Sequence, residues 1–126
     1  MDNDIRALAS MAQAYFDAAY AMDADGFESL FHPSSSVSSV TRVGDETIMS
    51  VTPIGPWLAA VRTMKAPKQL GLERCDEILS IDVVGELALI KLKLQIPPRH
   101  FTDMLSFAKI DKVWKIVQKV TSADSR

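Results

Sequence analysis

The fold of this chain is decided by Ser80–Ser122, which reads SIDVVGELALIKLKLQIPPRHFTDMLSFAKIDKVWKIVQKVTS. Apolar and polar residues alternate over long runs in this stretch, and a period of two predicts strands. Gly85-Glu86 predicts a two-residue turn, and a second turn is expected near Asp111. Pro97-Pro98 should break the stretch in the middle. We therefore predict four successive strands joined by short turns.

The first hairpin of this stretch has a clear inward face. The turn at 85–86 should pair the apolar residues of its two strands, Ile81 and Val83 with Ala88 and Ile90. The second strand of the hairpin should then bury every other residue, namely Ala88, Ile90, Leu92, Leu94 and Ile96. Lysines alternate with these positions, as is typical of the solvent face of an antiparallel sheet.

The preceding part of the chain predicts helices and a further hairpin. A helix with one buried stripe is indicated by Ile5, Leu8, Ala9, Ala12, Phe16 and Ala19. A short helix should run over about 24–31, capped by Asp23 or opened by a capping box of Asp25 with Glu28, and Pro33 should end it. Two strands over 37–51 should flank a turn at Gly44-Asp45, and a third helix should open at Thr52-Pro53 or at Pro56 and end by Pro67.

This order predicts an α+β domain, in which three helices pack on one face of a curved antiparallel sheet. With 126 residues and no linker, one domain should cover 1–126. The net charge of −2 is dispersed, so we expect neither a nucleic-acid partner nor a membrane. The N-terminus lacks a secretory signal pattern and Cys75 is alone, which favours a cytoplasmic location.

The residue pattern favours no metal and no cofactor. The two histidines, His32 and His100, are far apart and form no HxH or HExxH spacing. A single cysteine provides no thiolate site, and no glycine-rich loop is present that could hold a phosphate.

Asp103 is the strongest candidate for a functional residue. A two-residue loop at 110–111 or 111–112 predicts one inward face on the last hairpin, made of Asp103, Leu105, Phe107, Trp114, Ile116, Gln118 and Val120. Lys119 and Thr121 should then point outward. Burial should raise the pKa of Asp103, so that a protonated carboxyl donates to a ligand oxygen beside the Tyr15 hydroxyl. Alternatively, Asp103 bonds Gln118 or a backbone amide and orders the sheet.

Several segments together resemble the nuclear transport factor 2-like superfamily. They are the entry AYFDAAYAMDADGFESLFHP (14–33), the hairpin SIDVVGELALIKLKL (80–94) and the hairpin FTDMLSFAKIDKVWKIVQKV (101–120). The chain is most similar to the bacterial group labelled putative lumazine-binding and to SnoaL-like polyketide cyclases. The resemblance implies a cone, cystatin-like in shape, whose sheet wraps a pocket closed by the long helix. It also implies homodimers through the outer sheet face. It does not imply one activity.

Ketosteroid isomerase, a member of this superfamily, uses an Asp base with an oxyanion hole of Tyr and protonated Asp. Tyr15 stands eight residues before Asp23, as the oxyanion tyrosine does in that family, and Asp103 opens a similar alternating run. The family's base would fall on Ser39, eight residues after Phe31, and serine is not a base. The resemblance thus implies an oxyanion pair without its proton acceptor. His32 or His100 could replace the base, since histidine titrates near neutral pH.

We expect this protein to bind a small apolar molecule that carries a carbonyl or phenolic oxygen. Asp103 and Tyr15 would hold the oxygen. The pocket would be lined by Phe16, Trp57, Leu105, Phe107, Trp114 and Ile116, with Gln118 beside them. One alternative is an isomerase, dehydratase or cyclase that uses Asp103 with Tyr15 or His32. The other is a non-catalytic dimeric interaction domain whose cone is filled by its own side chains.

Overall fold

The computed structural model describes residues 2–96 and 99–124. The helices are α1 (Asp2–Ala21), α2 (Ala24–Glu28) and α3 (Ile54–Val61). The strands are β1 (Ser36–Val43), β2 (Glu46–Pro53), β3 (Asp76–Val84), β4 (Leu87–Ile96), β5 (Arg99–Ile110) and β6 (Val113–Asp124). The predicted order of elements, two helices, two strands, a helix and four strands, is confirmed. Within these ranges, no helix is long and apolar enough to cross a membrane.

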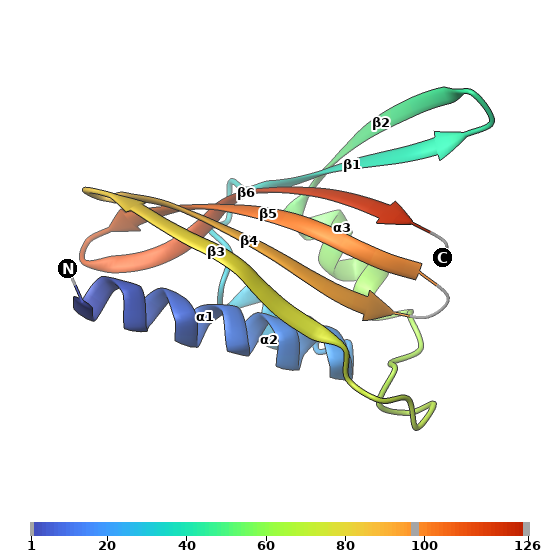
Figure 1. The fold of residues 1–126 in the computed structure, drawn as a ribbon, viewed down its shortest axis with the longest axis horizontal. Helices are drawn as coiled ribbons and strands as arrows, with labels where there is room; N and C mark the ends of the chain where they lie inside the picture. Colours follow the sequence, from blue (N-terminus) through green and yellow to red (C-terminus); the bar gives the residue numbers. More distant parts are fainter. Residues whose placement is uncertain (1, 97–98, 125–126) are drawn as a thin grey trace.

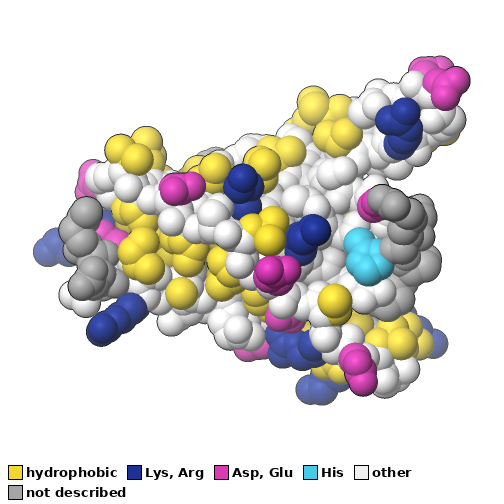
Figure 2. Space-filling view, viewed as in Figure 1, with side chains coloured by type: hydrophobic (Ala, Val, Ile, Leu, Met, Phe, Trp, Pro, Cys, Tyr) yellow, Lys and Arg dark blue, Asp and Glu magenta, His cyan; other side chains and the backbone are white. Residues whose placement is uncertain are grey.

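The described strands form one six-stranded sheet in the order β2-β1-β6-β5-β4-β3. All neighbours are antiparallel except β1 and β6, which run parallel. The sheet is curved, and α1 and α2 lie along one of its faces (Figure 1). The β1–β2 hairpin extends away from the other strands, and Figure 2 shows apolar side chains on it and charged ones at its tip.

The predicted register of the first C-terminal hairpin is confirmed. Ile81 pairs with Ile90, and Val83 pairs with Ala88. Along β4 the predicted inward residues are buried or half-buried, and the strand ends at Ile96. The predicted break at 97–98 lies outside the described residues.

The second C-terminal hairpin has the expected two-residue turn. Its residues Asp111 and Lys112 have φ angles of 50° and 69°. Two successive positive φ angles are typical of the turn that matches the twist of antiparallel strands. The turn therefore brings β5 and β6 together along their whole length.

The helix ends differ in part from the prediction. Asp23 caps α2 as expected, because its carboxylate accepts from the Gly26 backbone N–H at 3.1 Å. That helix ends at Glu28, three residues early. The third helix was expected to open at Thr52-Pro53, with Thr52 as its cap, or at Pro56; instead β2 continues through Pro53 and α3 starts at Ile54 without a side-chain cap.

A bulge between β5 and β6 changes the predicted inward face. Asp103 pairs with Thr121 and Ser106 with Gln118, but the next residue, Phe107, pairs with Ile116. Val117 is the extra residue, and an extra residue reverses the facing of the strand beyond it. The predicted face is correct at Trp114 and Ile116 but wrong beyond the bulge. There Lys119 and Thr121 are buried, whereas Val120 is exposed and Gln118 half-buried.

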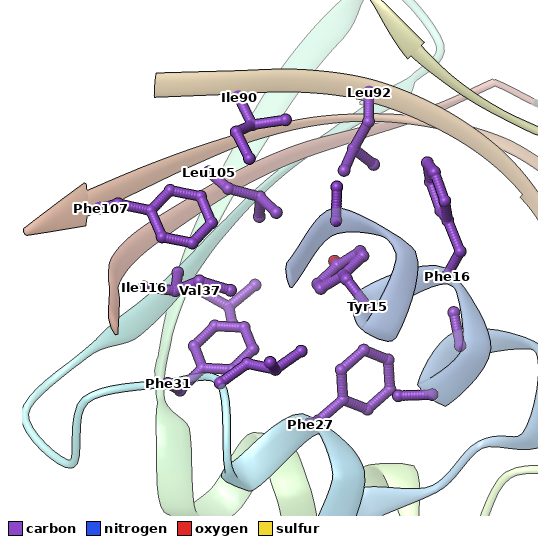
Figure 3. Close-up of a cluster of buried hydrophobic side chains, with 14 of the residues drawn as sticks. Tyr15, Phe16, Phe27, Phe31, Val37, Ile90, Leu92, Leu105, Phe107 and Ile116 are labelled. Carbon is purple, nitrogen blue, oxygen red and sulfur yellow. The ribbon is translucent and has the colours of Figure 1, made fainter. Parts of the chain in front are cut away.

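The core lies between the helices and the sheet. Figure 3 shows Leu105, Phe107 and Ile116 directed from the sheet toward Phe31 and Tyr15. Tyr15 packs edge-on against Phe27 at 5.2 Å between ring centroids. This aromatic packing fixes the side of α1 that carries the Tyr15 hydroxyl.

Candidate functional site

A cavity of about 320 Å³ lies between the C-terminal part of α1, α3 and the sheet. Most of its lining is apolar and includes Ala19, Met22, Phe27, Val37, Trp57 and Leu94. Ser39, Ser50 and Thr52 of the β1–β2 hairpin also line it. Four polar side chains reach it from buried positions, namely Tyr15, Asp103, Lys119 and Thr121. The cavity is therefore apolar with one polar end.

Asp103 is at the centre of this polar end and is only 1 % exposed. Its Oδ2 accepts from the Tyr15 hydroxyl at 2.6 Å, and its Oδ1 accepts from the Thr121 hydroxyl at 2.5 Å. The ammonium Nζ of Lys119 lies 3.7 Å from Oδ2. Both hydroxyl protons are thus committed to the carboxylate. This differs from the predicted arrangement, in which Asp103 and Tyr15 donate to a ligand.

Of the four buried polar side chains, Lys119 is the one that remains available to the cavity. Its side chain is 9 % exposed, and its Nζ lies 4.4 Å from the ring centroid of Trp57 and 5.3 Å from that of Tyr15. Among the described residues, Nζ has no hydrogen-bond partner within ordinary distance, and its one ionic neighbour is Asp103. An ammonium group carries three N–H donors. Lys119 can therefore donate to an oxygen placed in the cavity.

Burial changes the protonation of the groups around Asp103. It raises the pKa of Tyr15 well above the usual 10.0, and the negative charge and hydrogen bond of Asp103 raise it further. Burial also lowers the pKa of Lys119 from its usual 10.5, although the Asp103 carboxylate opposes this change. Tyr15 is therefore a neutral donor at physiological pH.

The remaining predicted pocket residues lie elsewhere, with the exception of Trp57. Leu105, Phe107 and Ile116 belong to the core. Trp114 is buried nearer the start of α1, where its Nε1 donates to Asp4 at 3.1 Å. These positions are close to the turn of the hairpin, whereas the cavity lies at the other end of the same strands.

Phe16 and Gln118 are also outside the cavity. Phe16 follows Tyr15 on α1, and successive helical residues point about 100° apart. It is buried against another part of the sheet, on the side away from Phe27 (Figure 3). The Gln118 amide bonds the hydroxyls of Ser36 and Ser38 at 2.9 and 3.0 Å, because the bulge turns it away from Asp103.

Neither histidine lines the cavity. The Nδ1 of half-buried His32 is 2.7 Å from the Ser34 hydroxyl. His100 lies on a separate open groove of about 620 Å³ together with exposed Cys75. Ser39, which occupies the position of the base in the isomerase comparison, does line the cavity. The described residues contain no cluster of three or more His, Cys, Asp or Glu side chains suited to a metal ion.

Comparison with Tyr15→Phe should show how the protonation of Tyr15 affects the stability of the folded protein at different pH values. A raised pKa in the folded state gives stability that is complete below pH 10 and is lost as the unfolded tyrosine ionises above it. The advantage of the natural protein over Tyr15→Phe should therefore shrink by roughly 1.4 kcal/mol per pH unit above about pH 10. Urea unfolding of both proteins between about pH 8 and 11 measures this. Lys119 is present in both proteins, so its own titration cancels in the comparison. If the difference in unfolding free energy between the two proteins did not change with pH, the raised pKa of Tyr15 would be contradicted.

Comparison with known proteins gives a family and a fold. The family model described as putative lumazine-binding matches residues 3–122. A protein of unknown function from Shewanella baltica OS155, described as NTF2-like, has a similar structure. The TM-score is 0.85, the identity 19 %, and the match covers 98 % of this chain and 96 % of that one.

Two further solved structures agree with this fold. An NTF2-like protein of unknown function from Silicibacter pomeroyi DSS-3 matches with a TM-score of 0.74 and 20 % identity over 98 % of both chains. A cystatin-like fold protein from Burkholderia xenovorans LB400 matches with a TM-score of 0.71 and 15 % identity, over 97 % of this chain and 92 % of that one. No curated protein matches the chain.

Proposed function

This chain belongs to the putative lumazine-binding family of nuclear transport factor 2-like proteins, and on that premise we propose that it binds a small, largely apolar molecule in the 320 Å³ cavity. A carbonyl or phenolic oxygen of the molecule accepts a hydrogen bond from Lys119. Tyr15 and Thr121 hold Asp103, and Asp103 in turn holds Lys119. The proposal keeps the expected class of ligand and changes the residue that contacts its oxygen.

The observation that carries this proposal is the buried Lys119 ammonium with unused donors. Burying a charged group is costly unless it is paired and hydrogen-bonded, and Lys119 has only a 3.7 Å ion pair and two ring faces. An oxygen acceptor in the cavity would supply the missing hydrogen bonds. Since Asp103 balances the charge, a neutral acceptor suits the site better than an anion.

The size of the cavity favours a compact ligand. Ligand pockets usually measure about 300–1,000 Å³, and this cavity is at the lower end of that range. Lumazine, which the family description mentions, is a flat bicyclic molecule with carbonyl oxygens. It therefore combines the ring surface that Trp57 and Phe27 can pack against with an acceptor for Lys119.

Binding is better supported than the enzymatic alternative. The predicted enzyme would use His32, His100 or Asp103 as its base, and neither histidine lines the cavity. Asp103 does line it, but both of its oxygens already accept hydrogen bonds from hydroxyl groups. A cone filled by its own side chains is less well supported too, since the space beside Trp57 is open.

A thermal-shift screen of phenols, enones, polyketide-like aromatics, pterins including lumazine, and flavins tests the proposal. A ligand at 100 times its dissociation constant should stabilise the protein by about 2.7 kcal/mol. Ala60→Trp should abolish this shift, because Ala60 is an exposed residue of α3 at the cavity and a large side chain there would fill the space.

Ala59→Trp is the matched control. Ala59 is the preceding exposed residue of the same helix, and it does not line the cavity. The control should keep both the fold and the shift. Equal shifts in Ala59→Trp and Ala60→Trp would place the ligand outside the cavity and overturn the proposal.

A further inference from the structure

We propose that Lys119 also captures aldehydes covalently in this cavity, as a protonated imine with Asp103 as its counterion. This inference rests on the proposed function, since it requires that a small apolar molecule enter the cavity. It specifies a chemical class of ligand, an apolar aldehyde, and a bond to one nitrogen atom.

The surroundings of Nζ fit an iminium ion as well as an ammonium ion. The Asp103 carboxylate lies 3.7 Å away and is itself fixed by Tyr15 and Thr121. The Trp57 ring, with its centroid 4.4 Å from Nζ, presents a surface that stabilises cations. A cation at this nitrogen is thus neutralised on one side and shielded from water on another.

The reaction conserves atoms and charge at Lys119. The unprotonated amine attacks the aldehyde carbon, a C–N bond forms, and the electron pair of the carbonyl π bond moves to oxygen. The oxygen takes two protons and leaves as water, while the nitrogen lone pair forms the C=N bond. Starting from the ammonium, the sum is R-NH₃⁺ plus an aldehyde giving an iminium plus water. The site carries one positive charge before the reaction and one after it, so Asp103 has a cation beside it in both end states.

Lys119 differs from the other lysines in the two properties that favour this reaction. All eight lysines are described, and only Lys119 is buried. Burial lowers its pKa, which increases the fraction of nucleophilic amine at neutral pH. The largely apolar lining of the cavity also limits the water available to hydrolyse an imine once it has formed.

The test is reductive trapping with 2-naphthaldehyde and sodium cyanoborohydride, followed by peptide mapping. The reduced adduct adds the mass of the aldehyde less one oxygen atom. With limiting aldehyde at neutral pH, Lys119 should be labelled at least about tenfold faster than exposed Lys93, because the cavity holds the aldehyde beside the Lys119 Nζ. Labelling of Lys119 at the same rate as Lys93, or slower, would overturn the inference.

Variants and a non-reactive analogue separate this inference from binding itself. Lys119→Arg keeps the positive charge beside Asp103 but cannot form an imine, so it should lose the adduct. Lys93→Met should keep it. 2-Naphthylmethanol has the same ring system without the aldehyde. If this alcohol stabilises the protein but Lys119 is not labelled, imine formation is refuted and binding stands. If neither the aldehyde nor the alcohol stabilises the protein, and Lys119 is not labelled, both imine formation and binding are refuted for this class of compound.

Discussion

Lys119→Met is expected to destabilise the protein by about 3–5 kcal/mol, because it leaves the Asp103 carboxylate buried without its cation. The side chains of Lys119 and Asp103 are 9 % and 2 % exposed, so the carboxylate has little bulk water to replace the lost partner. The two hydroxyl groups that bond Asp103 orient the carboxylate but do not neutralise it. Equilibrium unfolding in urea measures the loss.

A double variant is the control for this effect. Lys119→Met combined with Asp103→Asn removes both charges and keeps an amide beside the Tyr15 and Thr121 hydroxyls. It should recover most of the lost stability, because an uncharged polar group is far less costly to bury than an unpaired carboxylate. If the losses of stability in Lys119→Met and Asp103→Asn simply add in the double variant, the two residues do not act as an ion pair.

Phe107→Ala is expected to cost about 3–5 kcal/mol of stability, as large-to-small changes of buried aromatics do. Phe107 is 2 % exposed and packs in the core between the sheet and the helices (Figure 3). It does not line the cavity. The folded variant should therefore bind a ligand from the screen with nearly the natural affinity, measured by calorimetry well below its melting temperature.

Trp57→Ala should affect ligand binding more than stability, the reverse of Phe107→Ala. Trp57 is half-buried, packs edge-on against Phe27 at 5.0 Å, and lines the cavity. Its removal should cost less stability than that of Phe107, yet weaken ligand binding strongly. If Phe107→Ala weakened binding more than Trp57→Ala, the ligand would lie deeper in the cone, among the residues first expected to line it.

The sequence was sufficient for most of the architecture, and for one pair of the site. Strict alternation from Ala88 to Ile96 determines the inward face of β4, because a strand has only two faces. The hydrogen bond between Tyr15 and Asp103 joins Asp103, which the pattern and the resemblance both selected, to Tyr15, which the resemblance selected. Their role toward a ligand remains a prediction.

The sequence was not sufficient for Lys119 and Thr121. A lysine in an alternating strand is normally exposed, so local pattern assigns Lys119 to the solvent face. The bulge at Val117, where β6 pairs with β5, reverses that assignment. A lysine at an apparently outward position shows no sign of burial in the sequence.

The bulge also means that the residues of β6 alone do not decide the chemistry of the cavity. If β6 alternated regularly through Val117, its inward positions would be Gln118 and Val120, and the cavity would have an amide and an aliphatic group in place of an ammonium and a hydroxyl. Deletion of Val117 would instead remove the bulge and leave Lys119 and Thr121 inward. A backbone irregularity of one residue thus decides that the cavity carries a charge.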